Sequence, residues 1–181
     1  MSDDDNTWAL VLAAGDGRWL HGLSTTAAGF AVPKQFCSLD GGPSLLQEAL
    51  QRAQATAPHE RICTIVAAPH RLWWTGHLKS LPASNIIVQP RNRGTAIGIL
   101  LSLLHILKRD AQARVVLLPS DHYVCDEAEL ARSLITATSR LQSTPEEVIL
   151  LGFEPTEPDP ELSYIVPAAP KAPVGLRWSA S

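Results

Sequence analysis

The stretch "WALVLAAGDGRWLHGL", residues 8–23, decides how the rest of the chain is interpreted. Trp8–Ala13 is a short apolar run stopped by a glycine, which is the pattern of a buried strand. Gly15 and Gly17 then open a long loop that reaches Phe36, and a loop of this length inside a compact domain is usually functional or mobile. Successive N–H groups at the two glycines can form a cradle for an anion. A plain structural turn is the alternative, and the loop alone does not decide between the two.

Two common nucleotide-binding motifs do not fit this loop. A dinucleotide fingerprint requires a third glycine at position 20, where Leu20 stands. The phosphate-binding sequence Gly-Lys-Ser/Thr does not occur in the chain. A nicotinamide-dependent oxidoreductase is therefore a remote possibility.

Strand and helix patterns alternate along the rest of the chain. Strands are predicted at residues 61–68, 85–90, 114–118, 147–153 and 163–167. Helices are predicted to start at Ser44, with Gln47 in capping-box spacing, at residues 70–81 and 95–108, and after Asp126, with Glu129 in the same spacing. Such alternation favours an α/β fold with a Rossmann-like, doubly wound and mainly parallel sheet. Ligands bind at the carboxyl ends of the strands in sheets of this kind.

Composition excludes several classes of partner. The formal net charge of −3 provides no basic field for nucleic acid or for an anionic membrane. The apolar run at residues 96–107 is too short to cross a bilayer as a helix, and the acidic start does not resemble a signal peptide. The three cysteines show no CxxC spacing, so a cytoplasmic protein with reduced thiols is expected. The helix at 95–108 is apolar on most faces, which predicts burial against the sheet or a partner and makes a homo-oligomer possible.

Polar motifs follow the predicted strands. Pro33 fixes the backbone before Lys34, whose point charge suits phosphate oxygens, although a solvated surface lysine is the commoner case. Gln89 ends a strand and offers the donor and the acceptor needed to read a base edge. Gly94 and Thr95 open a helix, where free N–H groups and a hydroxyl can meet a ribose or phosphate. An ordinary N-cap is the alternative there.

Asp121 stands just past the carboxyl end of another strand. A carboxylate in this position suits Mg²⁺ held against a triphosphate, and a turn aspartate bonded to its own backbone is equally compatible. Ser120, Asp121 and His122 do not form a triad, because neighbouring side chains point in different directions.

Five motifs occur in an order that resembles the sugar-1-phosphate nucleotidyltransferases, and most of all their mannose-1-phosphate guanylyltransferase branch. The motifs are "LVLAAGDGRWLHGLS", "VPKQF", "NRGTA", "LPSDH" and "GFEPTEPDPELSYI". The resemblance implies a mixed, mainly parallel sheet of the nucleotide-diphospho-sugar transferase type. It also implies attack of a sugar 1-phosphate on the α-phosphorus of a nucleoside triphosphate, with Mg²⁺ as cofactor, in nucleotide sugar biosynthesis. GTP and mannose 1-phosphate are the favoured substrates.

The same resemblance assigns roles to individual residues. Lys34 and Arg18 would neutralise phosphate charge, Asp121 would bind the metal, and Tyr164 and Ser163 would approach the sugar. The nucleotide would be bordered by Ala13, Ala14, Gly15, Gly17, Gln89, Gly94 and Thr95.

The sequence departs from the family pattern in three places. Arg18 and Trp19 stand where the family has a hydroxyl residue and arginine, and Ser163 replaces a glycine before Tyr164. The later Glu-Lys-Pro segment and a second metal-binding aspartate are not found. The sequence therefore predicts an acidic tail at 1–7, an incomplete nucleotidyltransferase-like domain at 8–167 and an irregular tail at 168–181. A degenerate nucleotide-binding or regulatory module without turnover is the competing hypothesis.

Overall fold

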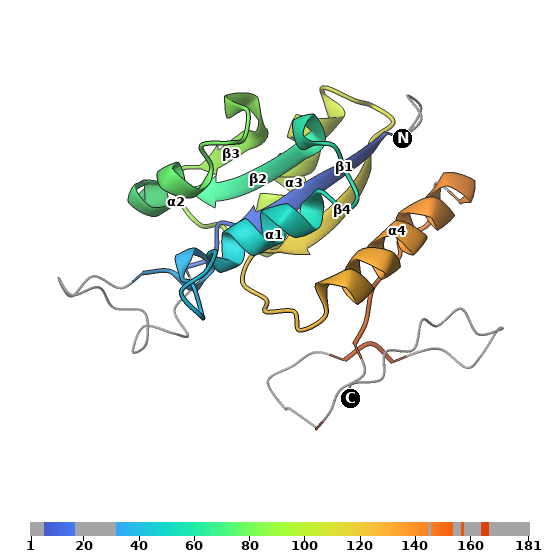
Figure 1. Cartoon of the computed structure of the whole chain (residues 1–181). Coiled ribbons are helices and arrows are strands. Elements are labelled where there is room, and N and C mark those ends of the chain that lie inside the picture. The colour runs from blue at the N-terminus through green and yellow to red at the C-terminus, as the bar shows by residue number, and fades with distance from the viewer. Residues whose placement is uncertain (1–5, 17–31, 145, 154–156, 158–163, 167–181) are drawn as a thin grey trace.

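Within the part of the chain that the structure describes, the sheet consists of four parallel strands. The computed structural model describes residues 6–16, 32–144, 146–153, 157 and 164–166. The strands are β1 (Thr7–Ala13), β2 (Ile62–Ala67), β3 (Ile86–Gln89) and β4 (Arg114–Pro119), in the order β3-β2-β1-β4 (Figure 1). The chain builds outward from β1 to β3 and then returns to add β4 on the other side of β1. This reversal is the topological switch point of a doubly wound sheet, and it confirms the predicted fold class.

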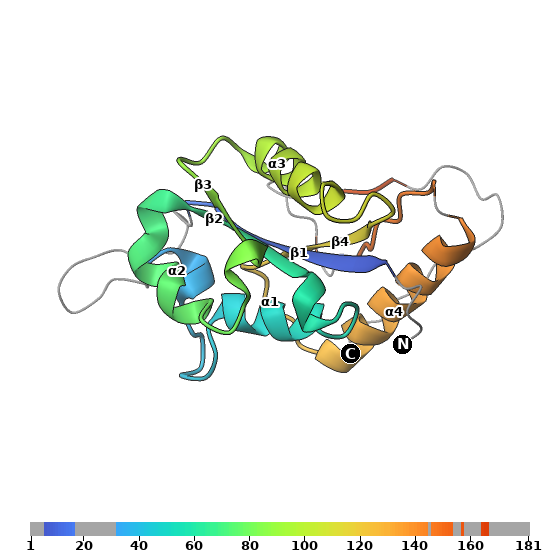
Figure 2. The ribbon, with the colours of Figure 1, turned by 90° about the horizontal axis from the view of Figure 1, so that it is seen from above.

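Helices cover both faces of the sheet. They are α1 (Leu45–Ala53), α2 (Arg71–His77), α3 (Thr95–Leu107) and α4 (Glu127–Ser143). Figure 2 shows α3 on one side of the strands and the other three helices on the opposite side. The side chains of β1 alternate between these layers: Ala9 and Val11 belong to the core with α1 and α4, whereas Trp8 and Leu10 pack with Ile106 of α3.

Both predicted helix caps are present. The Ser44 hydroxyl accepts a hydrogen bond from the Gln47 amide, and the Gln47 side chain accepts one from the Ser44 amide, which completes the capping box of α1. The Asp126 carboxylate accepts a hydrogen bond from the Glu129 amide at the start of α4. These local signals fix where the two helices begin.

Helix α3 contacts the sheet along a narrow side only. Gly98, Ser102 and Ile106 are buried, while its outer surface exposes the apolar residues Ile97, Leu100, Leu101 and Leu104. The sheet therefore covers one part of this apolar helix, and a partner on the remaining part stays a prediction. Among the described residues, no helix combines the length and the apolar character needed to cross a membrane.

The two last predicted strands are wrong within the described residues. Residues 147–153 and 164–166 form no strand, while Ser163 and Pro167 lie outside the described part. An apolar run becomes a strand only when a neighbouring strand accepts and donates its ladder hydrogen bonds. In the described part of the chain β4 pairs with β1 alone, so the antiparallel component of the predicted mixed sheet is not observed there. The predicted tails at 1–7 and 168–181 lie mostly or wholly outside the description.

Candidate nucleotide site at the ends of the strands

The end of β1 is held on both sides by buried side chains. The Gln35 amide donates to the carbonyl of Ala13, at 3.2 Å, and to that of Gly15, at 2.9 Å. On the other side, the Ser120 hydroxyl donates to the carbonyl of Leu12 at 2.6 Å. Both side chains are buried, so the backbone at the start of the glycine loop is fixed by groups from two distant segments.

A cavity of about 290 Å³ opens at this end of the sheet. It brings together six of the residues that the sequence predicts for a nucleotide site, namely Ala14, Gly15, Gln89, Gly94, Thr95 and Asp121. These residues follow β1, β3 and β4, so the cavity lies at the switch point between β1 and β4, where doubly wound sheets bind ligands. Ala13 does not line the cavity, because its side chain is buried in the core beneath.

Gly15 leaves open space in the structure. A Cβ atom at this position would have no atom of the described residues within 4 Å, and the φ of Gly15 lies outside the left-handed region. Packing and turn geometry therefore do not require glycine here. Gly94, by contrast, has a φ of 88°, a backbone conformation that other residues rarely adopt.

Gln89 is buried and presents its amide to α3. A Cβ atom on Gly98 would lie 3.4 Å from the Gln89 Nε2 atom, so this glycine gives the amide room beside the helix. Within the described residues, the Gln89 side chain makes no hydrogen bond, although only 3% of it is exposed. The Gln89 amide atoms are not among the fully buried side-chain atoms that lack a hydrogen bond in the described residues, so the amide reaches the cavity, where water or a ligand can bind it.

The start of α3 faces the same cavity. Gly94 is the N-cap, and its N–H donates to the Asn92 side chain at 2.8 Å. No side chain caps the helix, so Thr95 does not serve as an ordinary N-cap. The first N–H groups of α3 and the positive end of its dipole are thus directed at the cavity.

Lys34 forms an ion pair with Asp121, which lines the cavity, although Lys34 itself is not among the lining residues. Lys34 lies on the short helical turn Lys34–Phe36, and its Nζ atom is 4.0 Å from the Asp121 Oδ2 atom. The two side chains are 31% and 46% exposed. His122 Nε2 lies 3.9 Å from the other carboxylate oxygen, and its side chain is largely exposed. Lys34 is therefore partnered by a site residue, and Asp121 lies beside Lys34 and the His122 ring, with no hydrogen bond to its own backbone among the described residues.

The donor set at Asp121 suits Mg²⁺. No group of three or more His, Cys, Asp or Glu side chains that could hold a metal occurs among the described residues. Mg²⁺ is commonly bound by one or two carboxylates, with phosphate oxygens and water completing its octahedron. Asp121 fits that role, since it is half-exposed and lines the cavity.

Two histidines pack around the turn that carries Lys34. Phe36 lies between His70 and His77, with ring centroids 6.2 and 5.7 Å away. Burial lowers the pKa of both histidines, and at His70 the charge of Asp16 partly opposes that decrease in pKa. His77 Nδ1 also lies 2.9 Å from the Ser44 hydroxyl. The neutral imidazoles therefore form part of the packing beneath the lysine.

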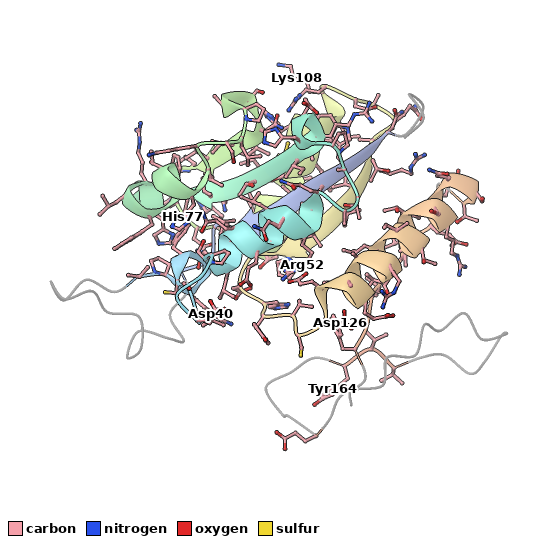
Figure 3. All side chains as sticks on the ribbon, in the orientation of Figure 1. Asp40, Arg52, His77, Lys108, Asp126 and Tyr164 are labelled. Carbon is pink, nitrogen blue, oxygen red and sulfur yellow. The ribbon has the colours of Figure 1, made fainter. Side chains whose placement is uncertain are left out.

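Several predicted residues are not brought to the cavity. Tyr164 is not among its lining residues, and Figure 3 shows it below the start of α4, apart from His77. Gly17, Arg18 and Ser163 lie outside the described residues. Their roles stay predictions.

The sequence interpretation missed Gln35 and the role of Ser120. Gln35 directly follows Lys34, and Ser120 directly precedes Asp121, so both stand beside residues that drew attention. Nothing in the local pattern indicates that their partners are backbone carbonyls of β1. The one local signal is in "KQF", where Gln35, whose side chain both donates and accepts hydrogen bonds, stands beside the apolar Phe36.

Comparison with known proteins finds relatives of this chain. The family model described as "Nucleotidyl transferase" matches residues 8–166. Over 158 residues the chain is 32% identical to a mannose-1-phosphate guanylyltransferase of Salmonella montevideo and 30% identical to the xanthan biosynthesis protein XanB of Xanthomonas campestris pv. campestris. These matches cover 86% of this chain and 32% of each relative, so the chain spans about a third of their length.

A solved structure has a similar fold. It is described as mannose-1-phosphate geranyltransferase from Thermus thermophilus, with 28% identity and a TM-score of 0.62. The match covers 78% of this chain and 39% of that one.

Proposed function

The chain belongs to the nucleotidyl transferase family, and on that premise we propose that it transfers a nucleotidyl group from a nucleoside triphosphate to a sugar 1-phosphate. An oxygen of the sugar phosphate attacks the α-phosphorus, the bond to the β-phosphate breaks, and pyrophosphate leaves. The products are a nucleotide sugar and pyrophosphate. The observation that carries the proposal is the cavity at the β1–β4 switch point, where Gly15, Gln89, Gly94, Thr95 and Asp121 converge.

The chemistry requires alignment and charge neutralisation, and no covalent enzyme intermediate. Lys34 would neutralise phosphate charge, and the open space beside Gly15 would admit the phosphates close to the backbone. Asp121 would hold Mg²⁺, which supplies positive charge to the developing pyrophosphate. Because Lys34 pairs with Asp121 in the free protein, a cation on Asp121 would release Lys34 toward the phosphates.

The base and the ribose would lie against β3 and α3. The unpartnered Gln89 amide provides both donor and acceptor capacity, and the uncapped start of α3 provides N–H groups for ribose or phosphate oxygens. We favour GTP and mannose 1-phosphate as substrates, because relatives at 30–32% identity are named mannose-1-phosphate guanylyltransferases. A cytoplasmic location belongs to the same proposal and agrees with the three free cysteines.

A nucleotide-binding module without turnover is the second candidate. The cavity of about 290 Å³ is at the lower end of the range for ligand sites. It suits part of one nucleotide, and the described residues place no predicted sugar-binding residue in it. The same binding groups would then serve a regulatory role.

Two measurements test these proposals on the full chain. We expect calorimetry to show GTP binding that tightens with Mg²⁺, and a pyrophosphate-release assay with sugar 1-phosphates to separate the enzyme from the binding module. Asp121→Asn should remove the Mg²⁺-dependent part of binding while lowering the free energy of unfolding by less than about 1 kcal/mol, since the pair is half-exposed. Asp40→Asn, an equal change of charge in an exposed turn, should leave binding unchanged. Triphosphate binding that is undetectable in the unmodified chain would contradict both candidates.

A further inference from the structure

Gln35 holds the glycine loop by two carbonyls. One Nε2 atom donates to the carbonyls of Ala13 and Gly15, and the side chain is only 3% exposed. An amide nitrogen carries two hydrogens, so both are used on the loop. The two acceptors are two residues apart in the chain. The peptide groups 13–14 and 15–16 therefore both direct their oxygens toward the Gln35 side chain.

The opposite sides of these peptide groups carry N–H donors. In a trans peptide the N–H points away from the carbonyl, and the described residues contain no cis peptide bond. Hence the N–H groups of Ala14 and Asp16 point away from Gln35. Ser120 binds the carbonyl of Leu12, and alternate peptide groups of a strand face opposite edges. The Ala14 N–H group, which follows directly on β1, is therefore directed toward the edge of β1 on which Ser120 lies, next to Asp121.

We propose that Gln35 is a positioning residue for triphosphate binding, because it fixes the peptide groups at the start of the glycine loop, including the one that presents the Ala14 N–H donor beside Asp121. This inference rests on the proposed function and adds a residue that acts through the backbone. Donors fixed before the ligand arrives bind phosphate oxygens without the entropic cost of ordering the loop. Gln35 itself need not touch the nucleotide.

Asn85 provides a matched control at the other end of the sheet. Its Nδ2 atom donates to the carbonyls of Glu60 and Ile62, both at 2.9 Å, and its side chain is fully buried. The chemistry is the same as at Gln35: one amide and two carbonyls spaced two residues apart. The difference is the location, since Asn85 precedes β3 and Glu60 precedes β2, at the amino ends of the strands.

The test compares Gln35→Met with Asn85→Leu, which both replace the amide by an apolar side chain of similar size. The probes are guanosine, GMP and GTP, titrated calorimetrically in Mg²⁺ at a temperature where circular dichroism shows each variant folded. We expect Gln35→Met to weaken GTP binding by about tenfold or more and guanosine binding by less than about twofold, since charge-assisted donors to phosphate are the stronger ones. Asn85→Leu should lower the thermal midpoint and leave all three affinities unchanged.

Gln35→Glu provides a second variant in case Gln35→Met does not fold. Its carboxylate has no donor for the two carbonyls at about pH 8, whereas the protonated carboxyl restores one hydrogen bond. GTP affinity relative to the unmodified chain should therefore recover partly as the pH is lowered.

The outcomes separate this inference from the proposed function. Equal loss of guanosine and GTP binding in Gln35→Met, or a phosphate-dependent loss in Asn85→Leu, would overturn the positioning role while the proposed function stands. A chain that binds none of the three probes would overturn both.

Discussion

Gly98→Ala should stabilise the fold and weaken nucleotide binding. Gly98 is the fourth residue of the 13-residue helix α3 and is buried against the sheet. Its added Cβ would meet Gln89 Nε2 at 3.4 Å and Ile65 Cδ1 at 3.5 Å, which are ordinary contacts. Alanine is favoured over glycine inside a helix by about 0.8–1.0 kcal/mol. We therefore expect the free energy of unfolding to rise by about 1 kcal/mol and the thermal midpoint by about 2–4 °C.

The same methyl group lies on the wall of the cavity. It limits the positions of the Gln89 amide, which the proposed site uses to bind the base. Loss of one neutral hydrogen bond costs about 0.5–1.5 kcal/mol, so GTP affinity should fall by about twofold to thirteenfold. Stability and affinity are thus expected to change in opposite directions.

Urea denaturation followed by circular dichroism measures the first effect, with an unchanged m value as the sign of two-state behaviour. Calorimetric titration with GTP measures the second. Gly76→Ala is the matched control, because Gly76 is exposed on α2 and a Cβ there would have no atom within 4 Å. It should leave affinity unchanged. Destabilisation by Gly98→Ala would refute the packing described at α3, and unchanged GTP affinity would refute the role of Gln89.

Two further predictions concern stability. Burial lowers the pKa of His70 and His77 below the ordinary value of 6.5, so the folded state prefers neutral imidazoles. The contribution of the two neutral side chains to the stability of the fold is fully present above about pH 6.5. It is lost as the pH falls through the lowered pKa values. Between about pH 7.5 and 5.5, His77→Gln should therefore lose less unfolding free energy than the unmodified chain, as measured by urea denaturation. An equal loss in the two proteins would show that His77 does not cause the pH dependence. Glu127→Gln should lower the free energy of unfolding by about 1–3 kcal/mol, because it leaves the Arg52 guanidinium, 2% exposed, without its carboxylate. Glu129→Gln on the same helix, whose pair with Arg132 is exposed, should cost less than about 1 kcal/mol, and equal effects of the two variants would argue against the buried pair.

Local signals in the sequence predicted the elements that depend on neighbouring residues. The first four strands, the four helices and both caps follow from short-range periodicity and from side chains three residues apart. Convergence of Gly15, Gln89 and Asp121 also followed, because parallel strands place their carboxyl ends at one edge. The strand predicted at 147–153 failed, since an apolar run contains no information on whether a partner strand lies beside it.

Contacts across long stretches of sequence were not predictable in this way. The Ser120 hydroxyl bonds a carbonyl 108 positions earlier, and Arg52 pairs with Glu127 from 75 positions away. Figure 3 shows Arg52 on the side of α1 that faces α4, a relation fixed by packing of two helices on the same sheet face. Residue spacing within a single helix or strand does not predict a pair between two distant helices.

The polar groups at the two ends of the sheet differ in their partners, and this difference supports the proposed nucleotide site. At the amino ends of the strands, Asn85 is bonded to two carbonyls and to Arg109, and the Arg109 guanidinium lies 4.6 Å from the ring centroid of Trp8. The Trp8 indole in turn donates to Asp110 at 2.9 Å. The members of this network contact one another or the backbone, and these contacts stabilise the fold.

At the carboxyl ends the opposite holds for the described residues. Gln89 is buried without a hydrogen bond, the space beside Gly15 is open, and α3 begins without a side-chain cap. The concentration of these features around one cavity supports the proposal that a ligand binds there. Fixed backbone donors held by Gln35 and an amide with free hydrogen-bonding capacity at Gln89 match a ligand that is anionic at one end and polar and planar at the other, as a nucleotide is.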